Sequence, residues 1–118
     1  MTAARAALRR RSALLLLAAA LAGGGAAVAQ DLPTIPVAIK DHRFQPAEID
    51  LPVGKPVLLV IRNEDATAEE FDSTALHVEK VILGGRTERL RLRPLGPGRY
   101  PFMGEYHPDT AQGVVVAK

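Results

Sequence analysis

Near the end of the chain lies the stretch Tyr100-Pro101-Phe102-Met103-Gly104-Glu105-Tyr106-His107-Pro108-Asp109-Thr110-Ala111-Gln112-Gly113. A turn rich in glycine and proline, residues 96–99, precedes it, and a short apolar run, residues 114–117, follows it. Turn residues on one side and an apolar run on the other indicate a loop between two β-strands. The loop carries a thioether, two carboxylates and an imidazole, all of which are side chains that bind metal ions.

Short apolar runs alternate with turn residues through the rest of the chain after residue 34, which is typical of an all-β domain. We expect strands at residues 35–40, 47–51, 56–63, 70–73, 79–83, 86–93, 99–103 and 113–117. Residues 41–46 are expected to be a connection, and no segment of the domain shows a helical period. Seven or eight short strands predict a Greek-key β-sandwich, with a closed barrel as the alternative.

Residues 1–29 have the pattern of a secretory signal peptide. Arginines at positions 5, 9, 10 and 11 precede an apolar segment, residues 13–22, that is too short to span a bilayer. Ala27-Val28-Ala29 is a small-x-small cleavage site. We therefore expect cleavage after Ala29 and one exported domain at residues 30–118, with an uncleaved N-terminal anchor as the alternative.

The charge and the cysteine content exclude several classes of protein. Loss of the four arginines lowers the basic residues from 15 to 11 against 13 acidic ones, so the mature net charge is about −2 and nothing favours nucleic-acid binding. The absence of cysteine excludes disulfides and any cysteine-ligated iron–sulfur or copper centre. No catalytic residue is expected, because Ser73 is the only serine after the signal and no base is paired with it in the sequence.

Short motifs along the whole domain resemble the cupredoxin family, and within it the EfeO-type domains associated with bacterial high-affinity iron permeases. The motifs are Phe44-x-Pro46, Val53-Gly54-Lys55-Pro56, Asn63, Glu69-Glu70-Phe71-Asp72-Ser73, Glu79-Lys80-Val81-Ile82, Pro94-Leu95-x-Pro97-Gly98-x-Tyr100-x-Phe102, Gly104-Glu105-Tyr106-His107 and Thr110-Ala111-x-Gly113. The resemblance implies a periplasmic cupredoxin-like β-sandwich that handles iron, copper or both. Its implied partners are an inner-membrane iron permease and other periplasmic iron-uptake proteins, and a ferroxidase-type role stays open.

The stretch at residues 100–113 departs from the cupredoxin pattern at the copper ligands. Gly104 stands at the cysteine position, Ala111 stands at the methionine position, and only His107 matches a ligand. The upstream histidine position, about six residues after Asn63, holds Glu69. The resemblance therefore implies no blue-copper centre and a harder, more anionic site, which favours cations such as Fe³⁺.

The acidic residues form the pool from which such a site would be built. If residues 70–72 are a strand, Glu70 and Asp72 share one face, and Glu69 lies on the other face with Phe71. A solvated acidic edge with Lys80 as an ion-pair partner is the alternative. The candidate acidic ligands, grouped around His107, are Glu69, Glu70, Asp72, Glu79 and Glu105.

Two further residues could supply ligands of other kinds. His42 lies in the connection at residues 41–46 and can reach the end of the sandwich that carries the late loop. Met103 is expected to face away from Phe102, where its thioether could bind Cu(I). For both residues an ordinary surface role is the alternative.

The sequence thus predicts an exported protein that binds iron, with or without copper, and assists its uptake by a membrane permease. One alternative is a periplasmic copper carrier that uses His42, Met103 and His107. The other is a metal-free β-sandwich that docks a partner through its acidic residues.

Overall fold

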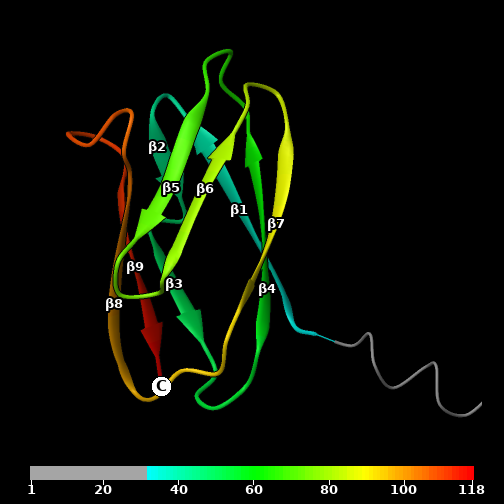
Figure 1. Cartoon of the computed structure of the whole chain (residues 1–118), viewed down its shortest axis with the longest axis vertical. Helices are drawn as coiled ribbons and strands as arrows, with labels where there is room; N and C mark the ends of the chain where they lie inside the picture. The colour runs from blue at the N-terminus through cyan, green and yellow to red at the C-terminus, as the bar shows by residue number, and fades with distance from the viewer. Residues whose placement is uncertain (1–31) are drawn as a thin grey trace, which may run out of the picture. The chain divides into compact units, whose positions relative to one another are not determined.

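The computed structural model describes residues 32–118, which form nine β-strands in two sheets (Figure 1). The strands are β1 (Thr34–Lys40), β2 (Arg43–Gln45), β3 (Glu48–Leu51), β4 (Val57–Asn63), β5 (Glu69–Ser73), β6 (Val78–Ile82), β7 (Thr87–Leu92), β8 (Gly98–Gly104) and β9 (Gln112–Ala117). The expected signal peptide, residues 1–29, lies outside the described residues. The described part of the chain contains no helix, and hence none long and apolar enough to cross a membrane.

The two sheets confirm the expected all-β sandwich. Sheet A has the strand order β2-β1-β4-β7, and sheet B has the order β3-β9-β8-β5-β6. The parallel pairs are β1 with β4 and β3 with β9, and the other neighbours are antiparallel. Residues on the inner faces of the two sheets alternate with polar residues on the outer faces, as sandwich packing requires.

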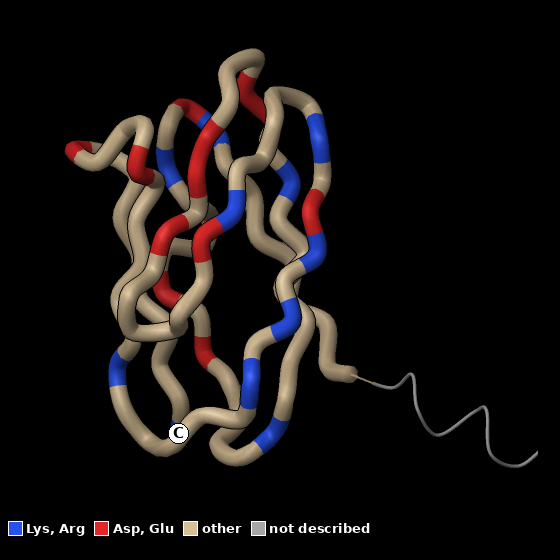
Figure 2. The backbone as a smooth tube through the Cα atoms, viewed as in Figure 1, with Lys and Arg blue, Asp and Glu red and all other residues tan. Residues whose placement is uncertain are grey.

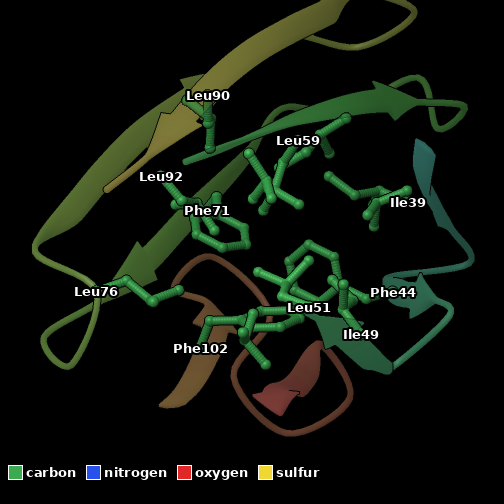
Figure 3. Packing of buried hydrophobic residues seen from close by; sticks show 14 of the residues in the cluster. Ile39, Phe44, Ile49, Leu51, Leu59, Phe71, Leu76, Leu90, Leu92 and Phe102 are labelled. Atoms are coloured by element: carbon green, nitrogen blue, oxygen red, sulfur yellow. The ribbon is translucent and has the colours of Figure 1, made fainter. Parts of the chain in front are cut away.

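Three phenylalanines pack together in the core between the sheets (Figure 3). Phe71 and Phe102 stack with ring centroids 4.8 Å apart, and Phe44 packs edge-on against both. The ring of Phe102 passes so close to β9 that a Cβ built on Gly113 would lie 2.2 Å from its Cζ atom. Glycine is therefore required at that position of the strand.

Strand β2 corrects the prediction of a plain connection at residues 41–46. It pairs antiparallel with residues 38–40 of β1 and buries Phe44 against the other two phenylalanines. Three residues with one inward side chain are too short to show a strand period in the sequence. Because β2 covers only that part of β1, Pro36 lies in a half of β1 that pairs on one side with β4, where its missing N–H is tolerated.

Candidate metal centre

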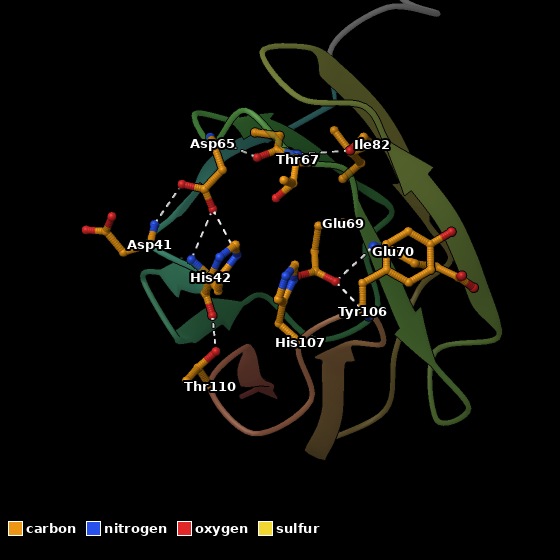
Figure 4. A network of polar contacts seen from close by, with 11 residues as sticks. Asp41, His42, Asp65, Thr67, Glu69, Glu70, Ile82, Tyr106, His107 and Thr110 are labelled. Carbon is orange, nitrogen blue, oxygen red and sulfur yellow. Dashed lines mark hydrogen bonds and ion pairs between the residues drawn. The ribbon is translucent and has the colours of Figure 1, made fainter.

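Three segments far apart in the sequence bring two imidazoles and a carboxylate together at one end of the sandwich (Figure 4). His42 lies in the turn between β1 and β2, Glu69 begins β5, and His107 lies in the loop between β8 and β9. One ligand atom from each of the three residues lies within 4.8 Å of the other two. Of the eight residues proposed as ligands from the sequence, these three form one group.

The carboxylate of Glu69 is buried and held in one orientation. Its side chain is 1% exposed and shares the inner face of β5 with Phe71. Its Oε1 atom accepts hydrogen bonds from the backbone N–H groups of Glu70 and Tyr106, each at 3.0 Å. Its Oε2 atom lies 2.6 Å from Nδ1 of His107, so that oxygen is the one directed at the imidazoles.

Gly104 makes room for this carboxylate. A Cβ built on Gly104 would lie 2.6 Å from Cδ of Glu69 and 2.6 Å from Cβ of Ala111. Real Cβ atoms do not approach other heavy atoms so closely. The position that matches the cysteine of the cupredoxin pattern is thus occupied by glycine, and the carboxylate of Glu69 lies in the adjoining space.

The loop that carries His107 is closed by its own backbone. The N–H of Gly104 donates to the carbonyl of Ala111 at 2.7 Å, across the two ends of the loop. Inside it, the N–H of His107 donates to the carbonyl of Gly104, and the N–H of Ala111 donates to the carbonyl of His107. These bonds fix the backbone from which the imidazole of His107 projects.

His42 occupies a two-residue turn in which Asp41 and His42 both have positive φ, 52° and 58°. Such turns suit hairpins, and histidine and aspartate adopt this conformation more readily than most residues. Two other loops hold the turn in place. Asp65 accepts hydrogen bonds from the N–H groups of Asp41 and His42 at 2.8 and 3.0 Å, and the hydroxyl of Thr110 donates to the carbonyl of His42 at 2.6 Å.

The loop that carries Asp65 is itself fixed by a buried amide. The side chain of Asn63 donates to the carbonyls of Thr67 and Ile82 and accepts from the N–H of Asp65. The hydrogen bond from the His42 amide is the main cause of a lowered pKa of Asp65, and the Asp41 amide adds to it. Asp65 is therefore an anion positioned 3.6 Å from Nδ1 of His42.

The two imidazoles stack on each other. Their centroids are 3.6 Å apart and their planes differ by 17°. His107 is 28% exposed, whereas His42 is 44% exposed, so the ring of His42 is the outer one of the stack. Since a metal ion lies close to the plane of each imidazole that binds it, the ring of His42 must turn for both rings to bind one ion.

A second group of carboxylates lies on the outer face of sheet B. Glu70, Glu79 and Glu105 bring one oxygen each to within 4.8 Å of the others. Loss of hydration raises the pKa of Glu70 to about 7, and hydrogen bonding and repulsion from Glu79 and Glu105 add to the shift. Loss of hydration and the charge of Glu70 also raise the pKa of Tyr106. This group contains acids alone and is more exposed than Glu69.

Asp72 and Met103 belong to neither group. They are paired across β5 and β8 and line a groove of about 320 Å³ on the outer face of sheet B. Met103 does face away from the buried Phe102, as its alternation in β8 predicted. Lys80, which the sequence offered as an ion-pair partner for the acids, instead pairs with Glu88 of β7 at 3.8 Å.

Sequence reasoning missed the residues that orient the candidate ligands. Asp65 and Thr110 were not considered, and each reaches the turn at His42 from a position more than 20 residues away. The one local signal is the turn itself, because an Asp-His pair between two apolar strands is compatible with positive φ at both residues. The partners of that turn depend on how the loops come together and leave no pattern in the sequence.

A comparison with protein families matches residues 13–117 to the Cupredoxin-like domain. The chain belongs to the cupredoxin family. A curated relative, the uncharacterized protein RP394 of Rickettsia prowazekii (strain Madrid E), is 40% identical over 82 residues. Those residues make up 70% of this chain and 66% of the relative, so the match spans slightly less than two thirds of the relative's length.

Solved structures show the same fold at low sequence identity. Auracyanin A, a blue copper protein from Chloroflexus aurantiacus, has a TM-score of 0.64 and 15% identity, covering 75% of this cupredoxin and all of that chain. The metal-binding domain of the Streptococcus pneumoniae D39 Cu(I)-exporting P-type ATPase CopA, solved with Cu(I), has a TM-score of 0.61 and 17% identity. That match covers 72% of this chain and 84% of the other. The structural relatives thus include copper proteins, although this member of the family contains no cysteine.

Proposed function

We propose that this cupredoxin binds a transition-metal ion, in the first place copper, through His42, Glu69 and His107. The observation that carries the proposal is the buried carboxylate of Glu69, whose Oε1 atom is bound by two backbone amides while Oε2 is directed at His107. A buried carboxylate is costly unless hydrogen bonds or a cation compensate its charge. Here two backbone amides and the imidazole of His107 contact the carboxylate. The imidazole of His42, stacked on that of His107, is available as a further ligand.

The donor set fits a metal ion but does not fit a blue-copper centre. Two imidazoles and one carboxylate suit Cu(II), Zn(II) or non-haem iron, whereas a blue-copper centre requires a thiolate. Ligand atoms around one ion at about 2.1 Å lie at most about 4.2 Å apart. The present separations, up to 4.8 Å, are close to that limit, and the turn of the His42 ring would supply the rest of the adjustment.

Each residue would have a distinct task in holding the ion. Glu69 would provide negative charge through a single oxygen, because the two amides retain the other. His107 would bind through Nδ1 after the proton shared with Glu69 has left. His42 would complete the set by turning out of the stack, with Asp65 as the anion that orients it. A bound ion would supply a positive charge that the buried carboxylate neutralises.

We propose further that the protein is exported to the periplasm and carries its metal to a membrane permease. The pattern of residues 1–29 and the resemblance to EfeO-type domains support this role. Iron is the second candidate metal, because a carboxylate replaces a soft or neutral ligand at Glu69 and stabilises harder cations. Tighter binding of Fe³⁺ than of Fe²⁺ would lower the reduction potential of iron and ease its oxidation by an external acceptor.

Calorimetric titration with Cu²⁺, Fe²⁺ and Fe³⁺ tests the centre. Glu69→Gln and His107→Ala should each lower affinity for the bound metal about 10-fold or more. The matched control is Glu79→Gln, which removes one charge from the outer acidic group and should leave the affinity unchanged. If the Glu79 variant loses metal affinity and the other two variants do not, the metal site is instead the acidic group on the outer face of sheet B. Tighter binding of copper than of either iron ion supports the copper assignment, and the reverse order supports the iron one.

A further inference from the structure

The outer face of sheet A carries a strip of cations that the metal centre does not use. Side chains point outward from alternate positions of its four strands, as the burial pattern of each strand shows. Figure 2 shows basic positions along β4 and β7, with one acidic position in β7, and mostly acidic positions along β5 and β6 of the other sheet. The outward residues of sheet A are Thr34, Pro36, Ala38, Lys40, Arg43, Gln45, Leu58, Val60, Arg62, Thr87, Arg89 and Arg91.

The five cations in that set, the basic face, have no carboxylate among them. Glu88 of β7 lies on the inner side of the strand and pairs with Lys80. The nearest acids along the chain, Asp41 and Glu64, lie in loops beyond the ends of β1 and β4. Within residues 32–118, none of the five cations takes part in an ion pair. Such a concentration of unpaired charge attracts an anionic surface.

The composition of the basic face matches a protein interface better than a lipid surface. Half-buried aliphatic side chains from β1 and β4, namely Ala38, Leu58 and Val60, lie between the cations. Four of the five cations are arginines, which are enriched in protein interfaces and pair with carboxylates through two hydrogen bonds. The large exposed apolar residues, among them Tyr106 and Met103, lie elsewhere, so the face offers nothing large to insert into a membrane.

A second copy of the chain could supply acids, because the outer face of sheet B carries Glu70, Asp72, Glu79 and Glu105. A contact between the basic face of one copy and the acidic face of another is heterologous. It leaves one basic and one acidic face free at the ends and does not close into a dimer. A distinct acidic partner gives a closed complex.

We propose that the basic face is the docking surface for an acidic protein. The partner's carboxylates would pair with Arg62, Arg89 and Arg91, while Lys40 and Arg43, which flank the turn at His42, would keep it beside the metal centre. Docking of this kind depends on the charges of sheet A and does not require that His42, Glu69 and His107 bind metal. Long-range attraction of this type accelerates association and weakens as salt is added.

The test uses a fluorescently labelled, glutamate-rich peptide with interspersed leucines as the probe. The variant Arg62→Gln/Arg89→Gln is compared with Arg99→Gln/Lys118→Gln, which removes the same charge from β8 and from the residue after β9, where both cations pair with acids. We expect the sheet A variant to weaken binding of the peptide by several-fold to about 10-fold and the control to change it less than about twofold. Melting curves of both variants verify that they remain folded.

Three outcomes would overturn the proposal. Equal loss of affinity in both variants would mean that net charge alone attracts the peptide. Binding to phosphatidylglycerol vesicles without binding to the peptide would assign the face to a membrane. Concentration-dependent self-association in sedimentation, abolished by the sheet A variant, would assign it to a second copy. Metal titration of the same variants should match the wild type, which separates this test from that of the metal centre.

Discussion

Glu69 and Gly104 share one space: the carboxylate of Glu69 fills the position that any side chain on residue 104 would enter. A Cβ on Gly104 would come within 2.6 Å of Cδ of Glu69. The glycine at position 104 of β8 and the carboxylate at position 69 of β5 therefore depend on each other across two neighbouring strands. Neither residue can change in size without consequences for the other.

Substitution of Gly104 by alanine should lower stability. The added methyl group would collide with Glu69 and with the buried Ala111, and overpacking of this kind costs about 1–3 kcal/mol in the free energy of unfolding. Urea denaturation measures the loss. Gly96→Ala is the matched control, because the nearest atom to a Cβ there, the hydroxyl oxygen of Tyr100, is 4.0 Å away. Equal stability of the two variants would show that the close approach at Gly104 is relieved at little cost.

The copper-loaded protein should lack the intense visible absorption of a blue-copper centre. That absorption requires a thiolate ligand, and the chain contains no cysteine. With nitrogen and oxygen ligands only, Cu²⁺ should give weak absorption and the electron paramagnetic resonance of a tetragonal site. An intense charge-transfer band in the titrated protein would contradict the proposed ligand set.

Binding of the metal should compete with the proton in the hydrogen bond between Glu69 and His107. The 2.6 Å contact joins Oε2 to Nδ1, and the proton between them occupies the lone pair that a metal needs. Affinity should therefore fall as the pH is lowered. Calorimetric titration at several pH values measures this fall, which should be shallower in His107→Ala because that variant lacks the imidazole for which protons compete. An affinity that does not change with pH would mean that the ion binds without displacing this hydrogen bond.

Asp65 should influence metal affinity mainly through His42, since its hydrogen bonds go to the turn that carries His42. Asp65→Asn removes the charge and one of two acceptors for the turn amides, so affinity should fall by about 10-fold or more. In a His42→Ala background the same change should have little further effect, since the two residues act in series. His77→Ala is the control for His42→Ala, because His77 also has positive φ, 55°, and lies outside the group. Additive effects of the Asp65 and His42 changes would show that Asp65 acts on the centre by another route.

The outer acidic group should make the metal-free protein less stable as the pH rises. The pKa of Glu70 is raised to about 7 from an ordinary 4.5, so the folded state binds the proton more tightly than the unfolded state. The stabilisation of the folded state by this bound proton is fully present below about pH 4.5 and is lost as the pH rises through about 7. Between pH 4.5 and about 7, the melting temperature of Glu70→Gln should fall less steeply with rising pH than that of the wild type. Glu48→Gln, an exposed acid outside the group, serves as the control, and parallel curves for all three proteins would exclude the effect.

Most of the fold could be predicted because alternation of apolar residues reports directly on which side chains face the core. The same alternation correctly separated Glu69 from Glu70 and Asp72, which divides the acids between the inner and outer faces. The sequence could not show that His42, Glu69 and His107 form one group. The approach of His42 to His107 depends on a turn with positive φ and on two distant loops. Those loops meet only when both sheets have formed.

The unequal fixation of the two histidines has a kinetic consequence. His107 and Glu69 are held by each other and by backbone amides, whereas the ring of His42 is the more exposed and the one that must turn. In the proposed centre, an incoming ligand from another molecule would take the place of His42 while Glu69 and His107 keep their positions. Such an exchange would let the proposed carrier deliver its ion after the rotation of one side chain, without complete dissociation.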